Sequence, residues 1–95
     1  MTEVDGGMEE RAVTIRNKWG IHARSAFAMV KTAMGFSASI TAEKDGVTAD
    51  CKQVADLLTL TAACGDTVVI KASGADKAAA LDAIESLIEA KFGED

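Results

Sequence analysis

The spacing of hydrophobic residues in this 95-residue chain changes repeatedly between a period of two and a period of three to four. A period of two places alternate side chains on one face of a β-strand, and the longer period places them along one side of a helix. The patterns follow one another in the order βαββαβα. Four short strands cannot bury both faces of a sheet against each other. We therefore expect an α+β, two-layer sandwich, in which an antiparallel four-stranded sheet is covered on one face by three helices and open on the other.

Turn and cap residues divide these patterns into separate elements. Asp45-Gly46 is a strong hairpin signal, and Gly65-Asp66 separates a short helix from the clearest strand pattern in the chain. The sequence predicts strands over residues 12–16, 38–43 and 67–72, with a further strand through Val47 and Ala49. It predicts helices from Ala23 to a stop at Gly35, over residues 52–62, and from a capping Asp76 to Lys91.

The length and composition indicate one domain. Hydrophobic residues make up 48% of the chain, enough for a packed core and too many for a wholly disordered protein. Residues 1–10 lack hydrophobic periodicity and hold four acids and no base, so we expect a flexible acidic tail there and a single domain over residues 11–95. No apolar run is long enough to span a bilayer and no signal-peptide pattern opens the chain, which predicts a cytoplasmic protein without membrane insertion.

Cysteine and histidine are too few and too widely spaced for a metal site. Cys51 and Cys64 form no CxxC pair, and one histidine supplies no ligand set. We expect both thiols to be free and buried, with a redox switch as the less favoured alternative.

Charge is distributed unevenly along the chain, whose net charge is −5. Residues 11–52 carry seven bases against three acids, whereas residues 53–95 carry three bases against eight acids. An acidic protein with one basic segment is poorly suited to nucleic-acid binding. The segment suits an acidic partner or a small anion, and a solvated surface of mixed charge explains it equally well.

The only histidine, His22, lies where the first helix is expected to begin. The first N–H groups of a helix have no partner within the helix and, with the helix dipole, favour an anion. The helix end and Arg24 both disfavour an imidazolium, so we expect a neutral ring able to attack phosphorus. The amides of Ala23 and Arg24 and the Arg24 guanidinium would then surround the transferred group. On these residues alone, an ordinary surface histidine remains an open alternative.

The segment Gly20-Ile21-His22-Ala23-Arg24 resembles the active-site motif of the HPr family, the histidine-containing phosphocarriers of the bacterial phosphoenolpyruvate-dependent phosphotransferase system. The resemblance extends over residues 11–93, through similar spacings of the turn at 43–46, the short helix at 52–60 and the starts of the last strand and helix. It implies the same open-faced sandwich.

The resemblance also implies roles for individual residues. His22 would accept a phosphoryl group on Nδ1 from phosphorylated Enzyme I and pass it to a IIA component in sugar uptake, with Arg24 assisting. Ala23, Arg24 and Ser25 would contact the phosphate, and no cofactor or metal is implied. The protein would be a monomeric carrier rather than a stand-alone turnover enzyme. Its partners would dock on the first two helices, at Phe27, Lys31, Val54, Ala55 and Leu58.

Three positions depart from the family pattern. Ser25 replaces the usual Pro after the Arg, but we expect the helix still to begin here, with a serine hydroxyl that reaches toward the phosphate. Gln53, after Lys52, replaces a regulatory Ser, so regulation by the family's serine kinase is doubtful. Trp19 stands where smaller polar residues are common in the family, and we expect plain packing for it, with a shield over the phosphoramidate or a contact with a partner as the less favoured alternatives.

Two other functions stay open. One is a regulatory relative of the nitrogen-type branch, in which phosphorylation controls partner binding rather than sugar transport. The other is an interaction module that performs no chemistry, although such a module needs neither His22 nor Arg24. Phe27 lies off the predicted core side of its helix, and it is either exposed or packed against the second helix.

Overall fold

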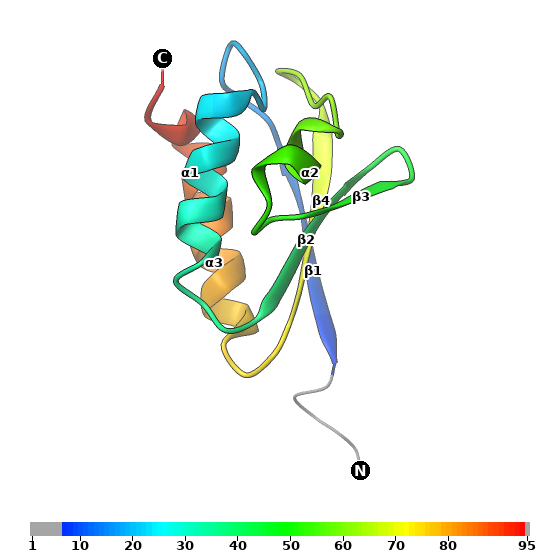
Figure 1. Cartoon of the computed structure of the whole chain (residues 1–95), viewed down its shortest axis with the longest axis vertical. Helices are drawn as coiled ribbons and strands as arrows, with labels where there is room; N and C mark the ends of the chain where they lie inside the picture. Colours follow the sequence, from blue (N-terminus) through cyan, green and yellow to red (C-terminus); the bar gives the residue numbers. More distant parts are fainter. Residues whose placement is uncertain (1–6, 95) are drawn as a thin grey trace.

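The computed structural model describes residues 7–94 and contains the predicted order of elements (Figure 1). The strands are β1 (Met8–Thr14), β2 (Ser39–Lys44), β3 (Val47–Asp50) and β4 (Thr67–Ser73). The helices are α1 (Ala23–Ala33), α2 (Val54–Leu58) and α3 (Lys77–Glu89), and a 3-10 turn over Lys91–Gly93 follows α3. The order βαββαβα is confirmed.

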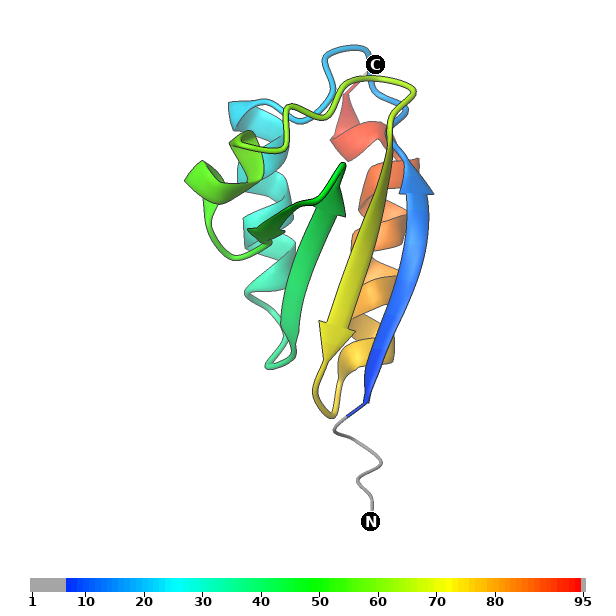
Figure 2. The ribbon, with the colours of Figure 1, turned by 90° about the vertical axis from the view of Figure 1, so that its right-hand side faces the viewer.

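The four strands form one antiparallel sheet in the order β1-β4-β2-β3. In Figure 2 the strands lie in front of α1 and α3, so the sheet face toward the viewer is not covered by a helix. Alternation in β4 explains the two faces, because Val68, Ile70 and Ala72 are buried while the residues between them are not. The predicted open-faced, two-layer α+β fold is confirmed.

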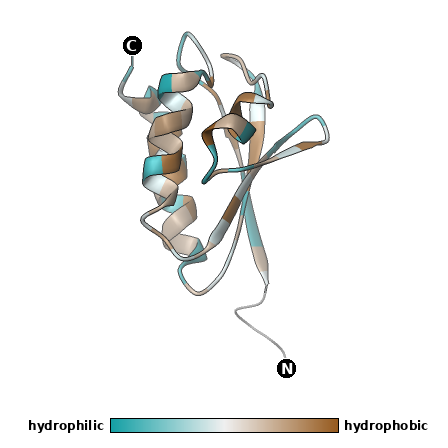
Figure 3. Ribbon diagram, viewed as in Figure 1, coloured by the Kyte–Doolittle hydropathy of each residue, from teal (hydrophilic) through white to brown (hydrophobic). Residues whose placement is uncertain are grey.

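The helices bury one side each against the inner face of the sheet. Met29 of α1 and Leu81 and Ile84 of α3 are at most 1% exposed. Hydrophilic and hydrophobic bands alternate along α1 in Figure 3, as expected for a helix with one buried side. The short α2 packs beside α1 and β3. This packing holds the amino end of α1 at the edge of the core.

The first strand starts earlier than its hydrophobic pattern predicts. Met8 pairs with Ser73 and Glu10 pairs with Lys71, so residues 8–10 belong to the sheet and not to the expected tail. Backbone hydrogen bonds to β4, which require no hydrophobic side chains, account for the difference. The predicted flexibility of residues 1–6 falls outside the described residues.

The second helix is shorter than the predicted span 52–62. It covers only Val54–Leu58, and of its predicted apolar face Leu57 is buried while Leu58 and Thr61 are exposed. Thr61 has a φ of +47°, which ends any helical continuation of the chain. The exposed Leu58 is thereby left for contacts outside the core.

Asp76 occupies the N-cap position of α3 without capping it through its side chain. Its carboxylate instead accepts hydrogen bonds from the backbone N–H groups of Ser37 (2.9 Å) and Ala38 (2.8 Å). Asp76 therefore ties the start of α3 to the loop before β2, and the predicted side-chain cap is wrong.

The two cysteines differ in their surroundings. Both are free, but Cys51 is buried and Cys64 is exposed, so the expectation of two buried thiols is wrong for Cys64. Residues 7–94 contain no cluster of three or more side chains suited to a metal ion. In the same range no helix is both long and apolar enough to cross a membrane.

Candidate functional site

The loop before α1 is held against the loop that follows α2. The N–H of Ile21 donates to the Ala62 carbonyl at 2.9 Å, and the buried Ile21 side chain anchors the segment in the core. Gly20 has a φ of +68°, a conformation that L side chains rarely adopt. These contacts fix the direction from which the chain enters α1, and with it the position of His22.

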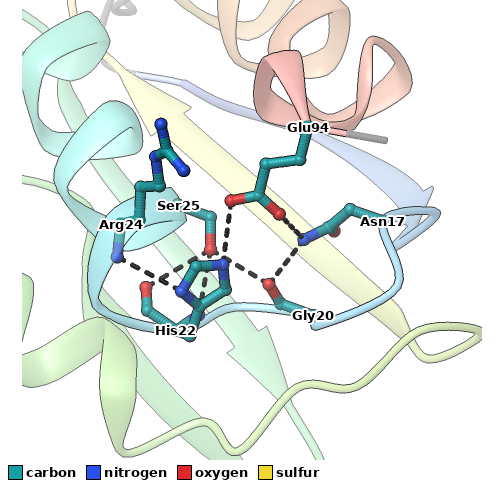
Figure 4. A network of polar contacts seen from close by, with 6 residues as sticks. All are labelled: Asn17, Gly20, His22, Arg24, Ser25 and Glu94. Atoms are coloured by element: carbon teal, nitrogen blue, oxygen red, sulfur yellow. Dashed lines mark hydrogen bonds and ion pairs between the residues drawn. The ribbon is translucent and has the colours of Figure 1, made fainter.

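His22 is the N-cap residue of α1 (Figure 4). Its Nδ1 accepts a hydrogen bond from the N–H of Arg24 at 3.4 Å, one of the N–H groups that a helix cannot satisfy internally. The side chain is 36% exposed, so a partner can reach it. The predicted position at the amino end of the first helix is thus confirmed.

The other ring nitrogen faces a carboxylate. His22 Nε2 lies 2.8 Å from Glu94 Oε2, and the Glu94 side chain is only 12% exposed. Burial acts to raise the pKa of Glu94, but hydrogen bonds from Asn17 and His22 and the charges of His22 and Arg24 outweigh it and leave the pKa lower than usual. Glu94 is therefore an ionised acceptor near neutral pH, and Nε2 is the nitrogen that holds the proton.

A second contact holds Glu94 in place. Nδ2 of the fully buried Asn17 donates to Glu94 Oε1 at 2.9 Å and to the Gly20 carbonyl at 2.7 Å. Figure 4 shows Asn17, Glu94 and His22 as one connected network. Sequence reasoning missed Asn17 and Glu94, because 72 positions separate Glu94 from His22 and no spacing pattern links them. The sequence offers one weak signal for Glu94, which is an acidic residue shortly after the hydrophobic Phe92.

Ser25 supports the loop before α1 through hydrogen bonds of its side chain. Its hydroxyl is fully buried, accepts from the His22 N–H at 2.9 Å and donates to the Gly20 carbonyl at 3.0 Å. The helix start therefore survives the replacement of Pro, as predicted. In this structure the hydroxyl proton is used within the loop and the side chain is buried, and the contact of Ser25 with a phosphate stays a prediction.

An open cavity of about 590 Å³ lies beside the imidazole. Lys18 and Arg24 bring positive charge to its lining, and Glu94 is its acidic member. The Trp19 side chain is 69% exposed, so core packing does not explain this residue. Lys18 Nζ lies 5.0 Å from the centre of the Trp19 ring, a cation–π contact at the cavity rim.

The predicted docking residues lie on the neighbouring helices α1 and α2. Phe27 is 62% exposed and Leu58 is 40% exposed, so Phe27 is not packed away against α2. Lys31 and Ala55 are also exposed, and Val54 is half-buried. The five residues thus present apolar side chains and one cation on α1 and α2, and the cation Lys31 lies in the last turn of α1, at the end away from His22.

Gln53 occupies the N-cap position of α2, where its side chain makes no capping hydrogen bond. Most side chains that cap helices are short and carry an oxygen close to the backbone, as Ser and Asp do. The position is therefore a helix start without a side-chain cap, as well as a site without a hydroxyl.

Known proteins share both the sequence and the fold. Residues 9–90 match the family model described as PTS HPr component phosphorylation site. The chain is 44% identical over 85 residues to the phosphocarrier protein NPr of Shewanella violacea, covering 90% of this chain and 93% of that protein. It is 34% identical over 87 residues to the phosphocarrier protein HPr of Cupriavidus necator, covering 92% and 98%. A crystal structure of HPr from Thermoanaerobacter tengcongensis has a TM-score of 0.87 and 39% identity, covering 92% of this chain and 98% of the other.

Proposed function

The chain belongs to the HPr family of phosphocarriers of the phosphotransferase system, and from that premise we propose that His22 is the residue that carries the phosphoryl group. The donor is phosphorylated Enzyme I, and the acceptor is a IIA component of a sugar permease. The protein itself completes no reaction, because it returns to its starting state only when the acceptor removes the group.

The observation that supports this proposal is the direction of the two nitrogens of the His22 ring. Nδ1 faces the N–H of Arg24 at the amino end of α1, while Nε2 is occupied by Glu94. A phosphoryl group bonded to Nδ1 would extend toward the backbone N–H groups of Ala23 and Arg24 in the first turn of α1, where the helix end favours negative charge. The exposed Arg24 guanidinium can add charge-assisted hydrogen bonds to its oxygens.

The partners dock beside this nitrogen, on the surface of α1 and α2 formed by Phe27, Lys31, Val54, Ala55 and Leu58. Exposed apolar side chains of this size are typical of protein–protein contacts when they gather on one surface. Phe27 and Leu58 provide that contact here, and Lys31 adds a cation for an acidic partner. The phosphoryl group would then pass directly between the two proteins.

The test is incubation with phosphoenolpyruvate and Enzyme I, followed by intact-mass measurement. We expect one added phosphoryl group that is lost in acid, as a phosphorus–nitrogen bond is and a serine ester is not. His22→Ala removes the only histidine and with it the adduct. A wild-type chain without an adduct, or an adduct that persists in His22→Ala, contradicts the proposal.

A second candidate is a regulatory carrier, whose phosphorylation controls the binding of partners instead of sugar transport. It is favoured by the comparison of two relatives. The chain is 44% identical to the phosphocarrier protein NPr of Shewanella violacea and 34% identical to the phosphocarrier protein HPr of Cupriavidus necator. Mixing the phosphorylated protein with a sugar-specific IIA component separates the two. Loss of the phosphoryl group supports the sugar branch, and its retention supports the regulatory one.

A further inference from the structure

We infer that Trp19 is an interface residue, which the protein that delivers the phosphoryl group covers when it docks onto His22. That protein is Enzyme I, and the chemistry that would recognise Trp19 is an apolar pocket bordered by carboxylates. The inference deepens the proposed function and rests on it, since it concerns the same transfer. It adds a contact in the loop before α1, outside the docking residues on α1 and α2.

Trp19 belongs to a turn whose two ends are held together. The N–H of Gly20 donates to the Asn17 carbonyl at 3.1 Å, and Nδ2 of the fully buried Asn17 donates to the Gly20 carbonyl at 2.7 Å. Lys18 and Trp19 are the two central residues of this turn. Because the hydrogen bonds already order the turn, its backbone loses little conformational entropy when a partner covers the indole.

The indole is open to solvent in the free protein. Its exposed fraction of 69% is the highest among the exposed large hydrophobic residues of the described chain. Lys18 Nζ, 5.0 Å from the ring centre, is the cation that contacts it. Tryptophan is enriched where proteins bind one another, since burial of an indole removes a large apolar area from water. A partner that buries Trp19 therefore gains a stabilisation that folding of this chain does not use.

The cavity beside His22 places Trp19 in the path of the donor. Trp19 and His22 line the same open cavity of about 590 Å³. In a direct transfer the donor must bring phosphorus to within about 3–3.5 Å of the His22 ring. The donor surface therefore has to approach this cavity, and Trp19 is the largest apolar side chain in its lining.

The charges around the cavity determine which partner surface fits. Lys18 and Arg24 are exposed, whereas the side chain of Glu94, the acid that the described residues contribute to the lining, is only 12% exposed. The surface next to the indole is therefore cationic where a partner meets it. Carboxylates around an apolar pocket would pair with these two cations, and a basic surface would be repelled.

The experiment measures KM and kcat of Enzyme I, supplied with phosphoenolpyruvate, for this chain as its substrate. We expect Trp19→Ala to raise KM at least about tenfold with kcat unchanged, because it removes a binding contact and no reacting group. Trp19→Phe keeps an aromatic ring and should recover most of the lost affinity. Equal KM values for Trp19→Ala and the wild type overturn the inference.

Met8→Ala is the matched control. Met8 is 64% exposed, close to the exposed fraction of Trp19, and it begins β1. The start of β1 lies at the opposite end of the molecule from the amino end of α1 (Figure 1). Met8→Ala should therefore have the KM of the wild type, and a KM raised as much as in Trp19→Ala overturns the inference.

A chemical donor separates a docking contact from an effect on the histidine itself. Potassium phosphoramidate requires no protein surface, so it should phosphorylate Trp19→Ala and the wild type at the same rate, and both adducts should hydrolyse equally fast. Slower modification or faster hydrolysis of Trp19→Ala overturns the inference, because Trp19 would then act on His22 or shield its phosphoryl group.

A fluorine label reports the contact directly. Trp19 is the only tryptophan, so 5-fluorotryptophan gives one ¹⁹F resonance. Its shift between H₂O and D₂O, which requires exposure to solvent, should shrink when Enzyme I is added, and a shift that stays the same at saturating Enzyme I overturns the inference. A shift that shrinks while Enzyme I leaves His22 unphosphorylated supports the contact and contradicts the proposed function alone.

Discussion

Gly20 and Ala62 are so close that a Cβ atom on Gly20 would stand 2.3 Å from the Ala62 carbonyl oxygen. The same carbonyl accepts the hydrogen bond from Ile21, the residue before His22. The loop after α2 therefore supports the loop that carries the reactive histidine, and only a residue without a side chain permits this approach.

Gly20→Ala should strongly destabilise the protein. The left-handed backbone costs an L residue about 1–2 kcal/mol, and displacement of the Ala62 backbone adds about 1–3 kcal/mol. Urea unfolding should show this loss in the free energy of unfolding. Gly65→Ala is the matched control, because Gly65 has a φ of +95° but nothing within 4 Å of its Cβ position. It should show only the backbone cost of about 1–2 kcal/mol, and equal losses in both variants would refute the close contact.

Asp76→Asn should lower the melting temperature at pH 7. Hydrogen bonds from the backbone N–H groups of Ser37 and Ala38 favour the carboxylate of Asp76 and lower its pKa, although desolvation opposes them. A carboxyl whose pKa is lower in the folded state stabilises the protein above its unfolded pKa, and this contribution disappears as the pH falls through the folded value. The gap in melting temperature between the wild type and Asp76→Asn should thus be constant above about pH 5 and shrink below pH 4.

Glu89→Gln, which changes an exposed acid without hydrogen bonds to a loop, serves as the control for Asp76. It should melt close to the wild type at every pH. A gap for Asp76→Asn that stays the same at pH 7 and pH 3 would show that the carboxylate charge is not what ties α3 to the loop before β2.

The elements whose hydrophobic residues face a core were predictable from the chain. Val68, Ile70 and Ala72 alternate with more exposed residues because only one face of the sheet is covered, and Ala26, Met29 and Ala33 repeat because α1 buries that side in the core. Residues 8–10 escaped prediction because an edge strand pairs through its backbone, and their side chains carry no repeating pattern.

The residues of the site also differ in how far the sequence predicts them. His22 and Arg24 were predictable, since helix-start chemistry is local and the motif is continuous in the chain. Glu94 was not, because its position depends on how the 3-10 turn around Phe92 returns the chain to α1. Ser25 was placed at the correct point of the helix, but the direction of its hydroxyl depends on the Gly20 carbonyl, which a local reading of the helix start does not include.

The two thiols should react at very different rates. Burial, together with the charge of Asp50, raises the pKa of Cys51 to about 12, whereas Cys64 is exposed. The thiolate is the reactive form, so Cys51 is protected both by its pKa and by its lack of access to solvent. With Ellman's reagent at pH 8, the native protein should release one equivalent of product quickly and a second only after denaturation. Cys64→Ser should abolish the fast phase, and a fast phase that remains in this variant would show that Cys51 is accessible.

Gln53→Ser should stabilise the protein by adding the missing cap to α2. A serine at the N-cap accepts a hydrogen bond from an N–H of the first helical turn, which Gln53 does not. The expected gain is about 0.5–1 kcal/mol in the free energy of unfolding, measured by urea denaturation. Gln53→Ala, which shortens the side chain without supplying an oxygen, should gain nothing, so the difference between the Ser and Ala variants isolates the cap. Equal stability of the Ser and Ala variants would contradict this prediction. It would show that the missing side-chain cap at the start of α2 has no energetic consequence.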